Sequence, residues 1–469
     1  MREEREREQV AVIGLGASGD AAARLALRKG SKVHVTDTSS EDAVAARGAV
    51  LRDLGAEVRL GGHDVGRIAS ADTVVVSPGI PPGAPVLAAL RARGVAWVSE
   101  PEFACRFIEG PLTIVTGTNG KTTTAALCAH LLREAGVDVA LGGNIGGGLG
   151  PPASTLAAAH PAADRIVLEL SSFQLADIRD LTPDVGVMTN LGADHMDRYA
   201  TVAEYHRDKR RLFEAGDENT TWVVNGDDPA VLAMAEGVPG TRLAFSLETA
   251  PSPGAYLSGG DLVLDAGGSD GAADPPRPRR VGAASDVRLL GRHNLANALA
   301  ALLAATASGA SPGSVRGALR SFAPLPHRLE PVGTFRGTRW VNDSKATNAA
   351  AAASALASVD GPVVLLLGGS DGGQDFGGLV PAMRGKVRAV VAYGAAGARA
   401  AAEVAEAAGS DIAVQRVGGR FREVVAAARA AARPGDTVLL APACSSFDMF
   451  ANYQVRGDAF RALAPDVPR

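Results

Sequence analysis

With 469 residues, the chain exceeds the size that a single hydrophobic core usually supports, so two to four domains are expected. Its 46% hydrophobic content, 21% charged content and formal net charge of -4 are those of a soluble globular protein and argue against a nucleic-acid partner. No apolar run is long enough to span a membrane, and the amino terminus alternates Arg with Glu, so a cytoplasmic protein is expected.

The first predicted unit opens with a strand at residues 10–13 and a glycine-rich loop at residues 14–19. A second strand, residues 33–36, ends in Asp37, about 20 positions after the loop, as in a dinucleotide-binding fingerprint. On its own this pattern would indicate NAD. A further strand, residues 73–76, leads into residues 77–80 at the sheet edge where open α/β folds bind ligands.

The second predicted unit begins with the apolar strand at residues 112–115, a loop at residues 116–123 and a helical stretch at residues 125–132. Backbone N–H groups can surround a triphosphate only where glycines leave room, and a helix N-terminus adds its dipole. Lys121 would supply a mobile cation and Thr122 a hydroxyl for Mg²⁺. Two residues rather than four separate Gly117 from Gly120, so an ordinary strand-to-helix turn remains an alternative.

Candidate metal ligands follow the next two strands of this unit. Glu169 lies at the end of the strand at residues 166–170, where a Mg²⁺ ligand is expected, although Ser171 and Ser172 could instead form a helix cap. His195 follows the strand at residues 185–189 and either supports a second metal or lies in an ordinary surface loop.

Lysine is rare in this chain, in which most basic residues are Arg. Lys209 lies on a predicted helix, residues 202–213, whose ordinary interpretation is a solvated face. Because an uncharged primary amine can be carbamylated and a guanidinium cannot, the choice of Lys also indicates chemistry.

The remaining candidates lie farther along the chain. Asn294 and Asn297 stand at the start of an Ala-rich helix and could bind adenine, with helix capping by Asn294 as the alternative. Arg328 and Lys345 lie near a predicted hinge at residues 324–326 and suit the neutralisation of a transferring phosphoryl group. Residues 249–286 are expected to form strands broken by a flexible insertion.

A third unit is predicted from buried strands at residues 362–367 and 436–440 with Ala-rich helices between them. Strands that alternate with helices along the whole chain indicate an α/β protein with doubly wound parallel sheets.

These motifs together resemble the Mur ligase family. The resemblance is carried by eight segments in order, which are residues 117–123, 143–146, 169–174, 195–199, 291–294, 325–328, 342–348 and 442–446. It implies a Rossmann-like N-terminal domain for a UDP-sugar (residues 1–106), a central P-loop ATPase domain with a parallel sheet (107–324) and a Rossmann-like C-terminal domain for an amino acid (325–469).

The resemblance also implies an activity, namely the ATP-dependent addition of D-glutamate to UDP-N-acetylmuramoyl-L-alanine through an acyl phosphate in cytoplasmic peptidoglycan precursor synthesis, by a monomer. A sister ligase for another amino acid and a non-catalytic nucleotide-binding regulator are the alternatives.

The family's site residues fall on named positions of this sequence. The UDP-sugar is expected to contact Gly14, Leu15, Gly16, Ala17, Ser18, Gly19, Asp37, Thr38, Ser77, Gly79, Ile80, Asn144 and Gln174. ATP is expected to contact Gly117, Thr118, Asn119, Gly120, Lys121, Thr122, Thr123, Asn294, Asn297, Arg328 and Asp343. The D-glutamate is expected to contact Thr347, Ser446 and Tyr453.

Two metal sites are implied, for Mg²⁺ or Mn²⁺. Thr122 and Glu169 would hold one ion, and His195 with a carbamylated Lys209 would support the other. The expected catalytic residues are Lys121, Lys209, His195 and Arg328.

One position departs from the pattern. Many relatives carry a cation at the place of Gly372, where it would pair with a substrate carboxylate. In this chain, either another Arg or backbone N–H groups would have to bind that carboxylate, or the affinity for the amino acid would be weak.

Overall fold

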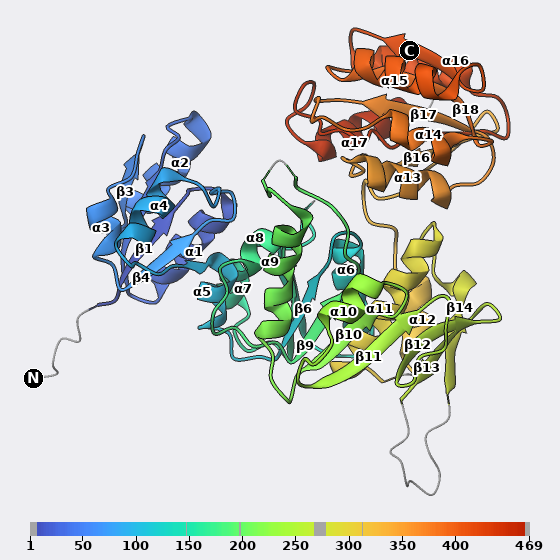
Figure 1. Cartoon of the computed structure of the whole chain (residues 1–469). Helices are drawn as coiled ribbons and strands as arrows, with labels where there is room; N and C mark the ends of the chain where they lie inside the picture. The colour runs from blue at the N-terminus through green and yellow to red at the C-terminus, as the bar shows by residue number, and fades with distance from the viewer. Residues whose placement is uncertain (1–6, 147, 197, 267–277, 312, 465–469) are drawn as a thin grey trace, which may run out of the picture. The chain divides into compact units, whose positions relative to one another are not determined.

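The computed structural model describes residues 7–146, 148–196, 198–266, 278–311 and 313–464. These residues form three sheets with helices packed on them, in blue, green to yellow and orange to red in Figure 1. The chain divides into two compact units, residues 1–286 with 296–320 and residues 287–295 with 321–469. The predicted α/β class with mainly parallel sheets is therefore confirmed.

The first sheet has five parallel strands in the order β3-β2-β1-β4-β5. Its strands are β1 (Gln9–Ile13), β2 (Lys32–Asp37), β3 (Glu57–Leu60), β4 (Thr73–Val76) and β5 (Val98–Ser99). Its helices are α1 (Ala17–Arg28), α2 (Asp42–Asp53), α3 (Val65–Ala69), α4 (Pro85–Ala92) and α5 (Glu100–Cys105). Successive strand residues face opposite sides, so Val10 and Val12 share a core with α1 while Ala11 and Ile13 share one with α4.

The second sheet has the strand order β14-β13-β12-β11-β10-β9-β6-β8-β7. Its parallel strands are β6 (Leu112–Thr116), β7 (Val139–Gly143), β8 (Arg165–Glu169), β9 (Val185–Met188), β10 (Thr221–Asn225), β11 (Thr241–Ser246) and β12 (Gly254–Ser258). Strands β13 (Asp261–Asp265) and β14 (Arg279–Ala283) extend this sheet in antiparallel fashion beside β12 (Figure 1). The predicted insertion in residues 249–286 lies partly outside the described residues, at 267–277.

Helices cover this second sheet and contribute to its core. They are α6 (Lys121–Glu134), α7 (Ala153–Ala159), α8 (Ser172–Leu175), α9 (Val202–Glu214), α10 (Pro229–Met234), the 3₁₀ turn η1 (Ala284–Asp286), α11 (Arg292–Ala307) and α12 (Val315–Ser321). One hydrophobic core runs from the first sheet into the second, because Phe103 of α5, Leu156 of α7 and Leu168 of β8 belong to the same buried cluster.

The third sheet has the order β15-β16-β20-β17-β18-β19. Its strands are β15 (Glu330–Phe335), β16 (Thr338–Asn342), β17 (Val363–Gly368), β18 (Val387–Tyr393), β19 (Ala413–Val417) and β20 (Thr437–Leu440). Leu365 and Leu367 share a core with α13 (Ala349–Ser358), η2 (Gly377–Leu379), α14 (Val380–Met383) and α15 (Gly397–Ala408). Val364 and Leu366 face the opposite side, with α16 (Phe421–Ala431) and α17 (Tyr453–Leu463).

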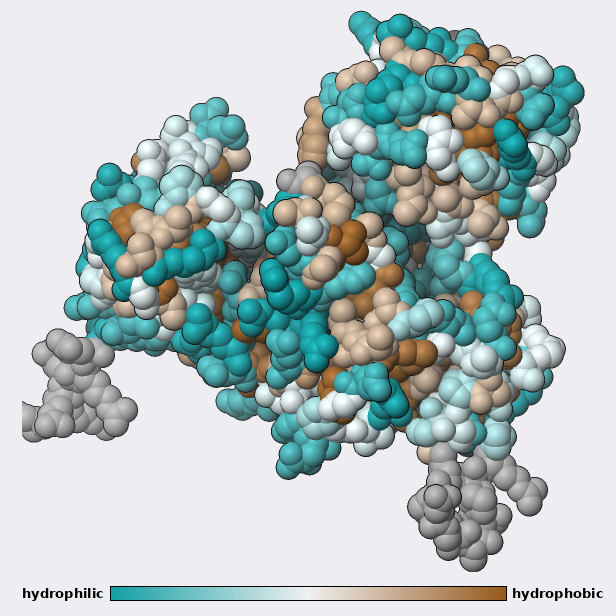
Figure 2. Space-filling model, in the orientation of Figure 1, coloured by the Kyte–Doolittle hydropathy of each residue, from teal (hydrophilic) through white to brown (hydrophobic). Residues whose placement is uncertain are grey.

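The described residues also show the state of the cysteines and the character of the helices. Cys105, Cys128 and Cys444 are free thiols, two of them buried and Cys105 half-buried. Within the described ranges, every helix is too short or too polar to cross a bilayer. On the face in Figure 2, hydrophobic residues form small patches scattered among hydrophilic ones. The predicted domain boundaries at 106/107 and 324/325 stay predictions.

A buried carboxylate fastens α5 to the segment that follows α8. Glu102, 2% exposed, accepts hydrogen bonds from the backbone N–H groups of residues 179, 180 and 181 at 3.0–3.1 Å. A carboxylate that accepts several backbone N–H groups is a strong anchor, because removing it leaves buried donors without a partner.

We therefore expect Glu102→Ala to lower the free energy of unfolding of the first unit by roughly 2–4 kcal/mol. The measurement is the thermal unfolding midpoint, which should fall clearly below that of Glu109→Ala, a matched change at an exposed position of the same segment. Equal midpoints for the two variants would contradict this interpretation.

Candidate active site

The loop between β6 and α6 has the geometry of a phosphate-binding loop. Gly117 has φ +142° and Gly120 has φ +82°, both in the region that favours glycine. A Cβ at Gly117 would lie 1.9 Å from Thr189 Oγ1, and one at Gly120 would lie 2.2 Å from Asn297 Oδ1. Both glycines are thus required by close neighbours, and the alternative of an ordinary, loosely packed turn is disfavoured.

Side chains after β9 hold this loop in place. The hydroxyl of Thr189 donates to the carbonyl of Asn119 at 2.6 Å, and Asn190 Oδ1 accepts from the N–H of Asn119 at 2.9 Å. The N–H of Gly192 donates to the hydroxyl oxygen of Thr118 at 2.9 Å. The loop is therefore preorganised by its neighbouring strand.

Two lysines converge on one backbone carbonyl of the loop. Lys121 Nζ donates to the carbonyls of Gly117 at 3.1 Å and Thr118 at 2.8 Å, and Lys209 Nζ donates to the same Gly117 carbonyl at 2.7 Å. Lys209 is 1% exposed, so the interpretation of its helix position as a solvated face is wrong. Burial, and next the charge of Lys121, hold the pKa of Lys209 well below its usual range.

Oxygen ligands suited to Mg²⁺ meet beside this pair. The hydroxyl of Thr122 donates to Glu169 Oε2 at 2.6 Å, and the Nδ2 of Asn144 lies 3.4 Å from Glu169 Oε1. Glu169 is only 2% exposed, so its carboxylate is held in a dry, oxygen-lined position that fits a hard cation. Among the residues that the structure describes, no group of three or more His, Cys, Asp or Glu side chains could hold a metal by itself.

His195 occupies a strained turn after β9. Its φ is +56°, and its carbonyl accepts from the N–H groups of Arg198 at 2.9 Å and Tyr199 at 3.0 Å. Its Nε2 lies 3.7 Å from Asp194 Oδ2, and its ring centroid lies 4.9 Å from that of Phe173. A non-glycine residue held at positive φ is uncommon and fits a functional turn.

The two predicted adenine contacts lie three residues apart on α11 and have different hydrogen-bond partners. Asn297 is 5% exposed, lies beside Gly120 and accepts from the hydroxyl of Thr124 at 3.4 Å, so its amide packs on the phosphate-binding loop. Asn294 Nδ2 donates to the carbonyl of Leu290 at 2.7 Å within the second unit. Asn294 is not the cap of α11, which begins at Arg292.

The glycine-rich loop of the first sheet is closed by two side chains. The carboxylate of Asp37 accepts from the N–H of Leu15 at 2.6 Å and of Ser39 at 2.7 Å, and Ser77 Oγ donates to the carbonyl of Gly14 at 2.8 Å. Helix α1 begins at Ala17 with no side-chain cap on its first turn, so Ala17, Ser18 and Gly19 present a helix N-terminus. Thr38 is exposed beside Asp37, and a Cβ at Gly16 would meet nothing within 4 Å.

Arg198 connects this sheet with the second one, and sequence reasoning missed it. Its guanidinium donates to the carbonyls of Pro78 at 2.7 Å and Ile80 at 2.8 Å, and lies 3.8 Å from the ring centroid of Phe173. The loop at residues 77–80 is thereby tied to the His195 turn. Arg198 belongs to the segment at residues 195–199, which was the available signal.

Gln174 has a structural use that its predicted role did not include. Its Oε1 accepts from the N–H of Ser171 at 3.0 Å, and Ser171 Oγ caps α8 in return. Gln174 is 1% exposed. The helix cap that was an alternative for this segment therefore exists, alongside the contact between Glu169 and Thr122.

The third sheet gathers its candidates at the carboxyl ends of adjacent strands. β16 is followed by Asp343 and Thr347, β20 by Ser446, and β20 lies between β16 and β17. The Leu329 N–H donates to Asp343 Oδ1 at 3.2 Å, and burial raises the pKa of Asp343 to about 7 against the opposing charge of Arg328. These candidates therefore meet at one edge of the sheet, as open α/β folds require of a ligand site.

Tyr453 lies at the same edge. Lys345 Nζ lies 4.3 Å from the Tyr453 ring centroid, and the hydroxyl of Ser344 donates to the Tyr453 carbonyl at 2.8 Å. Arg456, fully buried and not predicted, donates to the carbonyls of Ser344 at 2.8 Å and Ser445 at 3.1 Å. It thus fastens the loop after β16 to the loop after β20.

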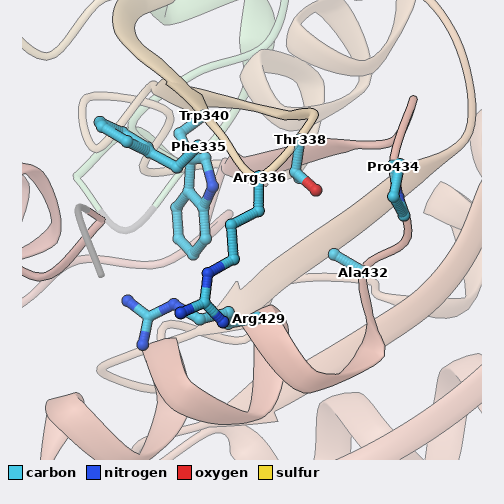
Figure 3. A pocket seen from close by; sticks show the side chains of 7 residues that line it. All are labelled: Phe335, Arg336, Thr338, Trp340, Arg429, Ala432 and Pro434. Atoms are coloured by element: carbon cyan, nitrogen blue, oxygen red, sulfur yellow. The ribbon is translucent and has the colours of Figure 1, made fainter. Parts of the chain in front are cut away.

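A hollow of about 310 Å³ lies elsewhere on this sheet. Figure 3 shows its lining, Phe335, Arg336, Thr338, Trp340, Arg429, Ala432 and Pro434. Thr338 begins β16 and Pro434 precedes β20, so the hollow is at the amino ends of these strands. It is separate from the candidate residues at their carboxyl ends.

Comparisons with protein families cover most of the chain. Residues 8–99 match the "Mur ligase MurD-like, N-terminal domain", residues 115–305 the "Mur ligase middle domain" and residues 327–444 the "Mur ligase, glutamate ligase domain".

Similar proteins extend over nearly the full length. Two relatives are each 40% identical to this chain, and each comparison covers 97% of it. They are the UDP-N-acetylmuramoylalanine--D-glutamate ligases from Pelotomaculum thermopropionicum, of which 97% is covered, and from Myxococcus xanthus, of which 98% is covered. The solved UDP-N-acetylmuramate-alanine ligase MurC from Thermotoga maritima has a TM-score of 0.57 at 17% identity, with 96% of this chain and 98% of that one covered. This structural likeness concerns the fold alone.

The close approach of Asn297 to Gly120 generates a prediction. We expect Gly120→Ala to weaken the binding of a non-hydrolysable Mg·ATP analogue by about tenfold or more, because the new Cβ must displace either the loop or Asn297. Calorimetric titration measures this affinity.

Gly136→Ala is the matched control. Gly136 has φ +85° at the other end of α6, and nothing lies within 4 Å of its Cβ position. The control shares the backbone strain and lacks the collision, so its affinity should stay at the wild-type value. Similar affinities in the two variants would refute the collision argument.

Proposed function

This chain belongs to the Mur ligase family, and we propose that it is the ATP-dependent ligase that joins D-glutamate to UDP-N-acetylmuramoyl-L-alanine in peptidoglycan precursor synthesis. The observation that carries the proposal is the convergence of Lys121 and Lys209 on the Gly117 carbonyl, beside the pair formed by Thr122 and Glu169. Identity of 40% over nearly the whole chain to ligases of that name supports the choice of substrates.

ATP is proposed to bind at the loop of residues 117–123, with its remaining contacts from Asn294, Asn297, Arg328 and Asp343. The buried pair of Thr122 and Glu169 would hold one Mg²⁺, which supplies charge neutralisation of the phosphates when bound. His195 and a carbamylated Lys209 would support a second ion, and Mn²⁺ is an expected substitute. The packing of Asn297 against Gly120 supports a role for it in shaping the loop as well.

The UDP-sugar is proposed to bind at the first sheet. The helix N-terminus at Ala17, Ser18 and Gly19 suits the diphosphate, and the loop of residues 77–80 borders the same edge. Asn144 and Gln174 would contact the sugar from the second sheet. Arg198 donates hydrogen bonds to the carbonyls of residues 78 and 80 and would thereby hold the loop at residues 77–80 in a fixed position relative to the His195 turn.

The chemistry follows from the poor reactivity of a carboxylate. Transfer of the γ-phosphoryl group of ATP to the terminal alanyl carboxylate yields an acyl phosphate and ADP. The amine of D-glutamate attacks the acyl carbon, the tetrahedral intermediate collapses, phosphate leaves and the amide forms with loss of a proton. Lys121 offsets the negative charge that accumulates when the two anions approach, while Thr347, Ser446 and Tyr453 would orient the amino acid.

The same proposal includes a cytoplasmic location, where nucleotide-linked precursors are made. It also includes a monomeric enzyme. A sister ligase that adds another amino acid is the alternative within the family. The sequence lacks an Asp-Asn-Pro-Arg segment, which argues against an acceptor of the diamino-acid type.

We expect phosphate release from ATP with UDP-N-acetylmuramoyl-L-alanine to occur when D-glutamate is added. L-glutamate, meso-diaminopimelate and D-Ala-D-Ala, tested in turn, should give only background release. Release with a different acceptor would reassign the chain to a sister ligase, and release with none of them would indicate a non-catalytic nucleotide-binding protein.

Lys209 provides a second test of the proposal. Because a guanidinium cannot carry a carbamate, we expect Lys209→Arg to lose nearly all activity, and Lys209→Ala to recover part of it with a short carboxylic acid such as acetate. Lys29→Arg, at the carboxyl end of α1, is the matched control and should keep wild-type turnover. Near-normal turnover of Lys209→Arg would eliminate the carbamate.

A further inference from the structure

The loop after β17 contains an open position where a substrate carboxylate needs a partner. D-glutamate has two carboxylates, and Gly372 offers no side chain to either. A Cβ at Gly372 would meet a single heavy atom within 4 Å, the Nε2 of Gln374 at 3.8 Å. The space above Gly372 is therefore open, and the nearest polar group to it is an amide nitrogen.

The arginine that contacts Asp371 and Gln374 of this loop is already engaged. Arg399 binds both carboxylate oxygens of Asp371 at 2.6 and 3.0 Å, and its Nη1 donates to Glu403 Oε1 at 2.6 Å. Its guanidinium also lies 4.7 Å from the ring centroid of Phe376. One positive charge shared by two carboxylates leaves no surplus for a substrate anion, so Arg399 does not replace the missing cation.

The same arginine holds Gln374 in place. Arg399 Nη1 donates to the backbone carbonyl of Gln374 at 2.7 Å, and the side-chain Oε1 of Gln374 accepts from the N–H of Ala349 at 3.1 Å. Because the Ala349 N–H is a donor, the side-chain atom of Gln374 that faces it must be the oxygen. The amide nitrogen, Nε2, must therefore point away from Ala349. In the part of the chain that the structure describes, this Nε2 has no hydrogen-bond partner.

Gln374 is also placed between the predicted amino-acid contacts. Ala349, which it caps, begins α13 two residues after Thr347. At the other end of the loop, the N–H of Ser370 donates to the carbonyl of Ser445 at 3.0 Å, next to Ser446. The loop that carries Gln374 therefore contacts both the segment after β16 and the loop after β20.

We propose that the Nε2 group of Gln374 binds a carboxylate of the incoming D-glutamate and so takes the place of a cation at residue 372. This inference rests on the proposed function, since it names the partner of that reaction's second substrate. Gln374 is a specificity residue here: its two N–H groups favour an anionic or carbonyl oxygen and offer nothing to an apolar side chain. Arg399 acts through Gln374 and is a positioning residue.

Gln374→Glu tests the donor separately from the cap. The carboxylate keeps an oxygen for the Ala349 N–H and replaces the donor by a negative charge that repels the substrate. We expect the KM for D-glutamate to rise by about tenfold or more, with the KM values for ATP and the UDP-sugar and the thermal midpoint unchanged. Gln415→Glu, the same charge change at an exposed position of β19, should leave all of these values at wild type.

A second pair of variants measures coupling between the two positions. Gln374→Ala should raise the KM for D-glutamate, and Gly372→Lys should lower it, because the open space above Gly372 admits a lysine. The gain from the lysine should be larger in the Gln374→Ala background than in the wild type, since both groups serve the same carboxylate.

The outcomes separate this inference from the function on which it rests. A wild-type enzyme active with D-glutamate, together with an unchanged KM for D-glutamate in Gln374→Glu, overturns the role of Gln374 and leaves the ligase intact. A lower thermal midpoint with an unchanged KM for D-glutamate also overturns it, because that result describes a helix cap only. A wild-type enzyme that releases no phosphate with D-glutamate overturns both.

Discussion

The hydrogen bonds from Lys121 and Lys209 to the carbonyl of Gly117 organise the central site. The Gly117 carbonyl oxygen accepts from both amines through its two lone pairs, and the backbone at Gly117 has a φ of +142°. This backbone position requires the absence of a side chain, because Thr189 occupies the space that a Cβ would need. Because Lys209 is buried on α9 and Lys121 begins α6, the position of the loop also fixes the relation between these two helices.

Burial of Lys209 has an electrostatic consequence for the same site. A buried ammonium group next to another cation is unfavourable, and this lowers the pKa of Lys209 and increases the fraction of the neutral amine. The neutral form is the one that can react with carbon dioxide, whereas Lys121, at the loop itself, serves as a cation. The two lysines therefore differ in chemistry although they contact the same oxygen, and the difference follows from their depth in the protein.

Local patterns predicted most of the fold and part of the site. Alternating strands and helices, glycines at turns and the rarity of lysine were enough to identify the α/β class, the loop at residues 117–123 and the unusual character of Lys209. Strand limits differ from the predicted ones by about one residue, as for β8, which ends at Glu169 rather than at Leu170. Contacts between residues far apart in sequence were not predictable: the approach of Asn297 to Gly120, the bonds from Arg198 to residues 78 and 80, and the burial of Arg456 depend on tertiary packing.

The loop after β17 illustrates how a site can lose a charge and keep a binding group. A lysine at residue 372 would attract any nearby anion over several ångströms, whereas an amide acts only in contact and only in the right direction. Direction is what the surroundings of Gln374 provide, since Arg399 fixes its backbone carbonyl and Ala349 fixes its side-chain oxygen. A preorganised neutral donor loses less entropy on binding than a flexible lysine does, so it offsets part of the weaker electrostatic attraction. Specificity at this position then depends on the rigidity of the loop, which makes the ion pair of Arg399 with Asp371 as relevant to substrate choice as any group that contacts the substrate.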